Sequence, residues 1–131
     1  MSDLRLPLKT KWFDMTKNGI KTEDYREITP YWIKRLVDND IDLTIDEINM
    51  GLCALRDGHT QDHVYNVYGF WFKSFTYNIM TLGYPNADDK DRIIQFEHKG
   101  IEVAYGNPEW GAESDKYYFV IKHGKQIKNN Q

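Results

Sequence analysis

Cysteine is nearly absent from this sequence, and histidine is sparse. Cys53 is the only cysteine, so no internal disulfide can form, and a reducing compartment fits best. Of the four histidines, His59 and His63 would share a face if their segment were helical, but no third ligand lies near them in the sequence. We therefore expect neither a metal site nor another bound cofactor.

Long apolar runs and a strongly basic balance are also missing. No run approaches the roughly 20 apolar residues of a membrane span, and the N-terminal residues lack the apolar core of a signal peptide. The net charge of −3 argues against a protein that coats duplex DNA, because that mode usually needs a strongly basic face. We expect a cytoplasmic protein with no membrane partner.

The length and composition of the chain fit one packed domain that spans residues 1–131. The length is close to that of a single domain, and the contents of hydrophobic (40%) and charged (28%) residues are ordinary for globular proteins. Aromatic residues are unusually frequent at 15%. Most of them are expected to pack between strands, which leaves some free to line a pocket or to stack on bases or sugars.

Charge is segregated along the chain. Acidic residues concentrate at 38–47 and 86–91. Basic residues are frequent near the N-terminus, which makes a local basic groove possible despite the negative net charge. Eight of the first 35 residues are Lys or Arg: Arg5, Lys9, Lys11, Lys17, Lys21, Arg26, Lys34 and Arg35.

Local patterns predict several short strands, with helices mainly in the first half. Alternating apolar and polar residues indicate strands at 4–10 and 22–28, and β-branched and aromatic residues indicate the later ones. Gly19, after Asn18, is a plausible left-handed terminator for the first helix. The predicted strands are 4–10, 22–28, 70–75, 77–82, 92–98, 101–105 and 116–123, and the predicted helices are 12–18 and 31–37.

Residues 38–66 are harder to interpret, because Gly51 and Gly58 interrupt an apolar spacing that fits a helix. We interpret them as a helical insertion, and we expect residues 124–131 to form a frayed tail. The order of elements predicts an α+β fold, a small, partly open β-barrel decorated by short helices.

The densest group of chemically useful side chains lies between Gly19 and Glu27. Lys21 stands at the entrance of the predicted strand, and Asp24 and Arg26 follow on one face, about 7 Å apart. Lys21 and Arg26 could hold a phosphate, or Asp24 could act as a base if Lys21 perturbs it. The alternative is an ion pair that only orders the sheet.

Carboxylates and aromatic residues elsewhere are further candidates. Glu97 could supply a second catalytic carboxylate near a turn at Gly100, although a solvated strand residue is the simpler interpretation. Glu109 and Trp110 lie in the loop GNPEWG, where Trp110 could be a stacking platform or could cap the core.

Three residues near the central motif could extend the binding surface. Lys9 and Lys11 could lengthen a basic groove, although solvated lysines are the simpler interpretation. Tyr25 could stack on a base or pack against a helix.

Two segments resemble the ASCH domain family, which is similar in fold to PUA domains. LKTKWFDMTKNGIKTEDYREITPYW resembles its signature, in which the motif Gly-x-Lys-x-x-Glu-x-Arg would fall on Gly19, Lys21, Asp24 and Arg26. HKGIEVAYGNPEWGAESDKYYFVIKHG resembles the closing strands of ASCH proteins found in bacteriophage and prophage genomes. The resemblance covers about half of the chain and implies a PUA-like barrel, a cytoplasmic location in the host if phage-encoded, and a cleft for RNA or a nucleotide-like ligand.

The chain departs from the family motif at one position. Asp24 replaces the family's Glu, so the carboxylate is one methylene shorter. Some ASCH proteins are amidohydrolases of acylated cytidine that use a Lys, a Thr nucleophile and a Glu, and others are ribonucleases. Lys21 matches that Lys, but the Thr falls on Asp24, which has no hydroxyl.

These observations leave three functions open. The first is a module that binds single-stranded RNA or a modified nucleotide through Lys21, Asp24 and Arg26, with Trp110 stacking on the base. The second is a ribonuclease or nucleoside-directed hydrolase that uses the same pocket, with Lys21 and Asp24 in acid/base roles. The third is a phage-encoded interaction factor whose segment 38–66 binds a protein partner.

Overall fold

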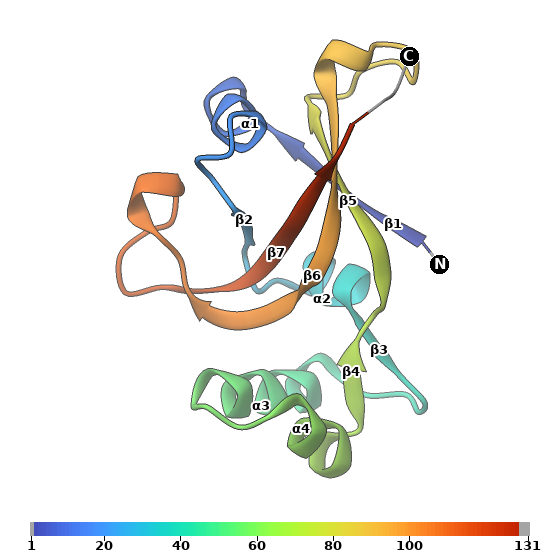
Figure 1. The fold of residues 1–131 in the computed structure, drawn as a ribbon. Helices are drawn as coiled ribbons and strands as arrows, with labels where there is room; N and C mark the ends of the chain where they lie inside the picture. The colour runs from blue at the N-terminus through green and yellow to red at the C-terminus, as the bar shows by residue number, and fades with distance from the viewer. Residues whose placement is uncertain (1, 129–131) are drawn as a thin grey trace.

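A curled five-stranded sheet forms the body of the molecule. The computed structural model describes residues 2–128. In the sheet the strands follow the spatial order β1-β5-β6-β7-β2, and the sheet bends into a half-barrel (Figure 1). The strands are β1 (Ser2–Leu8), β2 (Glu23–Arg26), β5 (Phe75–Leu82), β6 (Ile93–Tyr105) and β7 (Tyr117–Ile127). The predicted α+β class and barrel-like curvature are therefore confirmed.

The first strand is parallel to its neighbour, and the other pairings in the sheet are antiparallel. β1 pairs with β5, so the N-terminal segment forms one edge of the sheet, while β2 forms the other edge beside β7. Leu4 and Leu6 of β1 are buried in the core, as their alternation predicted.

Strand β6 is continuous where the sequence suggested two strands. The expected turn at Gly100 is absent; instead Gly100 has a φ of +111°, and the pairing with β7 shifts register between Phe96 and His98 and between His98 and Ile101. A bulge of this kind bends a strand without ending it. β7 likewise runs on to Ile127, so the predicted fraying is wrong for 124–127, and 129–131 lie outside the described residues.

The two edge strands are each followed by a short helix. α1 (Thr10–Lys17) follows β1 and ends before Gly19, whose φ of +77° confirms the predicted left-handed position. α2 (Pro30–Leu36) follows β2, and its first turn is capped by the Thr29 side chain, which accepts from Trp32 N.

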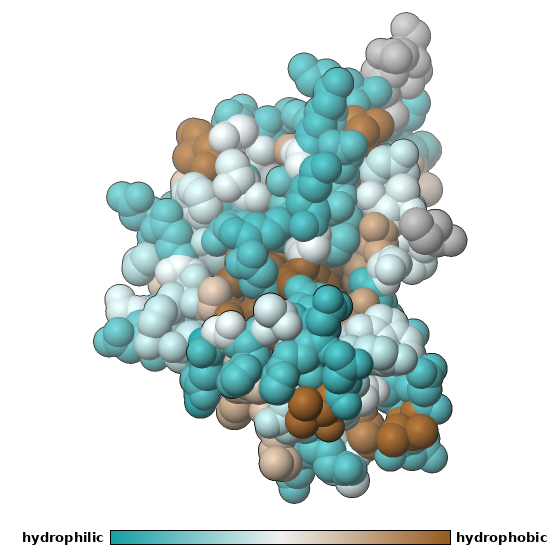
Figure 2. All heavy atoms as spheres, turned by 60° about the horizontal axis from the view of Figure 1, so that its bottom comes forward, coloured by the Kyte–Doolittle hydropathy of each residue, from teal (hydrophilic) through white to brown (hydrophobic). Residues whose placement is uncertain are grey.

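The segment that was interpreted as helical contains two helices flanked by a short β-ribbon. α3 (Ile45–Arg56) begins with a capping box of Thr44 and Glu47, and α4 (Gln61–Tyr68) begins at the cap Thr60. The ribbon consists of β3 (Val37–Asn39) and β4 (Phe70–Phe72). Viewed from beneath, hydrophobic residues emerge in separate spots on a mostly hydrophilic surface (Figure 2).

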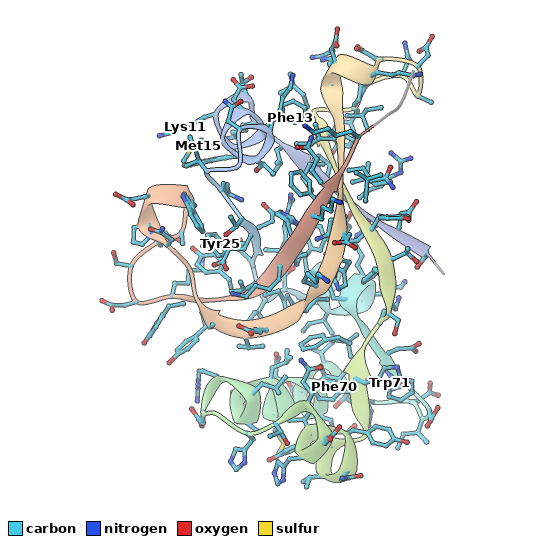
Figure 3. All side chains as sticks on the ribbon, viewed as in Figure 1. Lys11, Phe13, Met15, Tyr25, Phe70 and Trp71 are labelled. Atoms are coloured by element: carbon cyan, nitrogen blue, oxygen red, sulfur yellow. The ribbon has the colours of Figure 1, made fainter. Side chains whose placement is uncertain are left out.

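These helices share the core of the sheet. Phe70 lies on β4 beside the two helices (Figure 3), and it packs so closely against Gly51 of α3 that a Cβ at this glycine would overlap its ring. Ile48 and Leu52 belong to the same buried cluster as Leu4 and Phe119. Residues 38–66 are thus helical in large part and integral to the core.

Three remaining features complete the fold. Two 3₁₀ turns, η1 (Lys90–Arg92) and η2 (Pro108–Trp110), precede β6 and β7 respectively. Cys53 is exposed on α3. None of the helices within residues 2–128 is long and apolar enough to cross a membrane.

Candidate functional site

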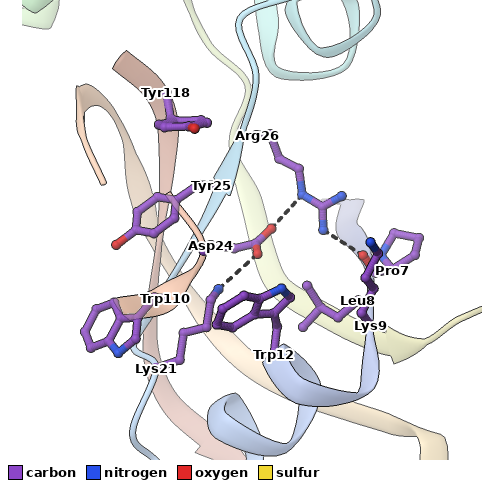
Figure 4. A pocket seen from close by; sticks show the side chains of 11 residues that line it. Pro7, Leu8, Lys9, Trp12, Lys21, Asp24, Tyr25, Arg26, Trp110 and Tyr118 are labelled. Atoms are coloured by element: carbon purple, nitrogen blue, oxygen red, sulfur yellow. Dashed lines mark hydrogen bonds and ion pairs between the residues drawn. The ribbon is translucent and has the colours of Figure 1, made fainter. Parts of the chain in front are cut away.

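A cavity of about 240 Å³ lies where the two edges of the curled sheet approach each other (Figure 4). The end of β1, the start of α1, strand β2 and the loop that contains η2 surround it. Its lining consists of Pro7, Leu8, Lys9, Trp12, Lys21, Asp24, Tyr25, Arg26, Trp110, Gly111 and Tyr118.

Lys21, Asp24 and Arg26 form a bonded triad in the wall of this cavity. Lys21 Nζ donates to Asp24 Oδ1 at 3.1 Å, and Arg26 Nε donates to Asp24 Oδ2 at 2.7 Å. Lys21 Nζ also donates to the Glu23 carbonyl at 2.6 Å. The side chains of Lys21 and Asp24 are only 2% and 5% exposed, and that of Arg26 is 17% exposed. Both carboxylate oxygens of Asp24 are therefore engaged, and the triad is largely removed from water.

The electrostatics of the triad keep Asp24 ionised. Burial alone would raise the pKa of its carboxyl, but the charges of Arg26 and Lys21 and their hydrogen bonds outweigh burial and lower it. A general base works best with a pKa near the operating pH. The geometry therefore makes Asp24 an anchor for two cations and a weak proton acceptor.

Arg26 extends the triad to the opposite edge of the sheet. Its Nη2 donates to the Pro7 carbonyl at 2.8 Å, and its guanidinium lies 4.9 Å from the ring centre of Trp32. Within residues 2–128, β1 and β2 share no strand pairing, so this side chain links the two edges.

Four aromatic side chains form another part of the wall: Trp12, Tyr25, Trp110 and Tyr118. Trp110 is held in η2, where Asn107 Oδ1 accepts from Glu109 N at 3.0 Å. Trp12 packs against the backbone of Gly111, so that a Cβ at this glycine would lie 2.9 Å from the indole.

Tyr25 and Tyr118 lie beside each other, with ring centres 5.8 Å apart. The Tyr25 hydroxyl donates to Glu23 Oε2 at 2.6 Å and accepts from Asn107 N at 2.9 Å, which ties the η2 loop to β2. Burial and the bond to Glu23 raise the pKa of Tyr25, so its phenol stays protonated. The aromatic wall is thus fixed before any ligand arrives.

A buried polar network lies on the sheet close to the triad. Asn78 Nδ2 donates to the Lys122 carbonyl at 3.0 Å and lies 2.8 Å from His123 Nδ1, while Asn78 Oδ1 lies 2.7 Å from His98 Nδ1. These contacts assign the Nδ1 proton to His98 and the Nε2 proton to His123. Burial, with Lys21 nearby, lowers the pKa of His123 to about 4, so its ring is neutral at pH 7.

The structure brings together most of the residues proposed from the sequence. Those that line the cavity are Lys9, Lys21, Asp24, Tyr25, Arg26 and Trp110. Lys11 is exposed and lies over the Trp12 ring, 4.8 Å from its centre, and Glu109 is exposed beside the cavity. The cavity is also lined by Trp12 and Tyr118, which the sequence did not single out as site residues.

Glu97 does not belong to this site. The expectation that it serves as a second carboxylate depended on a turn at Gly100, but β6 continues through that position as one bulged strand. Its Oε1 accepts from Lys125 N at 3.0 Å, and it is absent from the cavity lining. Asp24 is consequently the only carboxylate among the lining residues.

Comparison of the chain with known protein families, curated proteins and solved structures found no match. The resemblance to ASCH domains stays a prediction from the sequence.

Proposed function

We propose that this protein is an ASCH-like module that binds single-stranded RNA or a nucleotide-like ligand. The observation that carries the proposal is the cavity in which two indoles and two phenols surround a pair of cations bridged by one carboxylate. Aromatic side chains that accept a base by stacking, together with basic groups for the backbone, are how proteins bind single strands.

The size of the cavity supports one flat ring system as its occupant. Its volume, about 240 Å³, lies below the roughly 300–1,000 Å³ of pockets that enclose whole drug-sized ligands. Trp12, Trp110 and Tyr118 supply aromatic surface from three separate parts of the chain. A base can enter this space while the sugar and phosphate stay at its mouth.

The triad is better suited to binding a ligand than to catalysing its hydrolysis. The ammonium of Lys21 has three N–H donors, of which Asp24 and the Glu23 carbonyl use two. One donor is left for a carbonyl or ring nitrogen of a base. The hydrolase alternative requires a proton acceptor, and the single lining carboxylate has a lowered pKa.

The protein-partner alternative has a separate observation behind it. Met50, Tyr65 and Val67 are exposed on α3 and α4. On the face seen in Figure 2 the hydrophobic surface is divided into separate spots, whereas interaction sites usually form contiguous apolar patches. The cavity therefore carries the stronger proposal.

The test measures the affinities of the wild-type protein and of Trp110→Ala for short single-stranded RNAs and for a panel of nucleosides and nucleotides. Stacking contributes about 1–3 kcal/mol per base, so the variant should bind about 5- to 150-fold more weakly. Tyr105→Ala is the control, because Tyr105 is exposed and lies outside the cavity lining.

Equal affinities of wild type and Trp110→Ala would overturn the proposed base site. Mass analysis of the same mixtures tests the alternative that the protein is a hydrolase. A new product formed by wild type and lost in Trp110→Ala would make the protein a hydrolase.

A further inference from the structure

A second, larger cavity adjoins the first. It measures about 610 Å³ and shares Pro7 and Arg26 with the first cavity, so the two cavities meet at these residues. The residues of interest in its lining are Arg5, Arg26, Arg35, Tyr31, Trp32 and Tyr84. Its volume falls within the range of ligand-binding clefts.

Two of the three arginines that line this second cavity have no carboxylate partner among residues 2–128. Arg26 is bonded to Asp24, but Arg5 and Arg35 have no carboxylate within 4.0 Å among residues 2–128. No Asp or Glu belongs to the lining. An anion entering this cavity therefore meets two guanidinium groups that no internal ion pair neutralises.

Stacking holds one of these groups in place. The Arg35 guanidinium lies 5.4 Å from the ring centre of Trp32 and 5.5 Å from that of Tyr31. A guanidinium that stacks through its face keeps its N–H donors at the edge, which suits bidentate contact with a phosphate. The first cavity offers no equivalent, because Asp24 occupies both of its buried cations.

The second cavity is also lined by two exposed aromatic side chains. Tyr84 is 92% exposed and Tyr31 is 63% exposed, and both line the second cavity. Large aromatic side chains so open to water are available for stacking, because neither is committed to the core.

We propose that the second cavity binds the phosphate and base of the nucleotide next to the one in the first cavity. Arg5 and Arg35 contact the phosphate, and Tyr84 or Tyr31 stacks on the base. The ligand is then a single-stranded oligonucleotide of at least two nucleotides. This inference rests on the proposed function, because it takes the first cavity as a base site.

The experiment compares a 5′-labelled single-stranded heptamer, as RNA and as DNA, with the matching mononucleotide. The variants are Arg5→Ala, Arg35→Gln and their combination, with Arg92→Ala as the control for loss of an exposed arginine outside both cavities. Anisotropy gives heptamer affinities between 50 and 200 mM salt, competition gives the mononucleotide affinity, and thermal melting verifies that each variant folds.

We expect the double variant to bind the heptamer about tenfold more weakly or worse, with unchanged mononucleotide affinity. Its plot of log affinity against log salt should be shallower by about 0.7, since both arginines contact the same phosphate and each phosphate contact on a single strand contributes about 0.7. Tighter binding of the RNA heptamer than of the DNA heptamer would show that the site recognises ribose. Equal affinities for the two would show that the site binds single strands without distinguishing their sugars.

Three results would overturn the inference, and they differ in what they say of the first cavity. If the double variant binds the heptamer as tightly as wild type while Trp110→Ala loses binding, the second subsite is refuted and the base site in the first cavity still stands. Equal loss for heptamer and mononucleotide places the phosphate of the first nucleotide itself on Arg5 and Arg35. Absence of binding by wild type removes both proposals.

Discussion

Arg26 and Pro7 are 19 residues apart in the chain, yet Arg26 Nη2 donates to the Pro7 carbonyl at 2.8 Å across the open side of the half-barrel. The guanidinium is aimed there because Asp24 Oδ2 accepts from its Nε. The same side chain lines both cavities. One residue thus joins the edges of the sheet and sets the shape of the site, so its substitution affects both stability and binding.

Arg26→Lys should separate charge from geometry at this position. Lysine keeps the positive charge but lacks the planar fork that reaches Asp24 and Pro7 together. We expect a loss of about 1–3 kcal/mol in the free energy of unfolding, measured by urea denaturation, because one buried acceptor is left without its donor. The exposed Arg92→Lys is the control and should unfold like wild type. Wild-type stability in Arg26→Lys would show that the edge-to-edge bond contributes nothing.

Asp24→Asn should unfold far more easily than wild type. The change leaves Lys21 buried without its counter-charge, and breaking a buried pair in this way costs about 3–5 kcal/mol. Lys21→Met combined with Asp24→Asn should be less destabilised than the sum of the single changes, because the stranded charge is gone. Additive losses in urea denaturation would contradict this coupling. Loss of binding in Asp24→Asn alone therefore says little about catalysis.

Gly111→Ala should loosen the aromatic wall. Gly111 has a φ of +99°, and an added Cβ would lie 2.9 Å from the Trp12 indole. Gly58→Ala is a matched control, because Gly58 has a φ of +100° with nothing within 4 Å of the added atom. In both variants alanine must adopt a left-handed backbone conformation that glycine adopts without strain, which destabilises the folded protein by about 1–3 kcal/mol. Only Gly111→Ala should also weaken nucleotide binding and shift tryptophan fluorescence; identical behaviour of the two would show that the Trp12 contact is unimportant.

Local patterns in the sequence predicted much of the fold and the centre of the site. A period of two placed Asp24 and Arg26 on one face of β2, and the structure joins them through one carboxylate. Both early helices were predicted within two residues at their ends. These features depend on side chains that lie within a few positions of each other.

Long-range pairing could not be predicted in the same way. Glu97 was considered as a second catalytic carboxylate because a glycine between two strand-like runs usually indicates a turn. The pairing of β6 with β5 and β7 instead carries the strand through Gly100 as a bulge. Tyr118 escaped notice because its run, KYYFVIKH, is apolar on both faces, and only the register with β2 shows which side chains reach the cavity. Such registers are set by tertiary contacts that no local pattern contains.

The buried histidine network should make the protein less stable in mild acid. The pKa of His123 is about 4 in the folded protein and about 6.5 in the unfolded chain, so between these pH values the unfolded chain alone binds the proton. Stability from His123 is therefore complete above pH 6.5 and is lost as the pH falls toward 4, by about 3 kcal/mol. Burial also lowers the pKa of His98, which acts in the same direction, whereas protonation of Asp24 destabilises only at lower pH because its pKa lies below the ordinary value of 3.8. Urea denaturation of His123→Gln between pH 7 and 4.5 should show a much flatter profile than wild type, and the exposed His63→Gln should follow wild type. An equally steep profile in His123→Gln would assign the acid sensitivity to other groups.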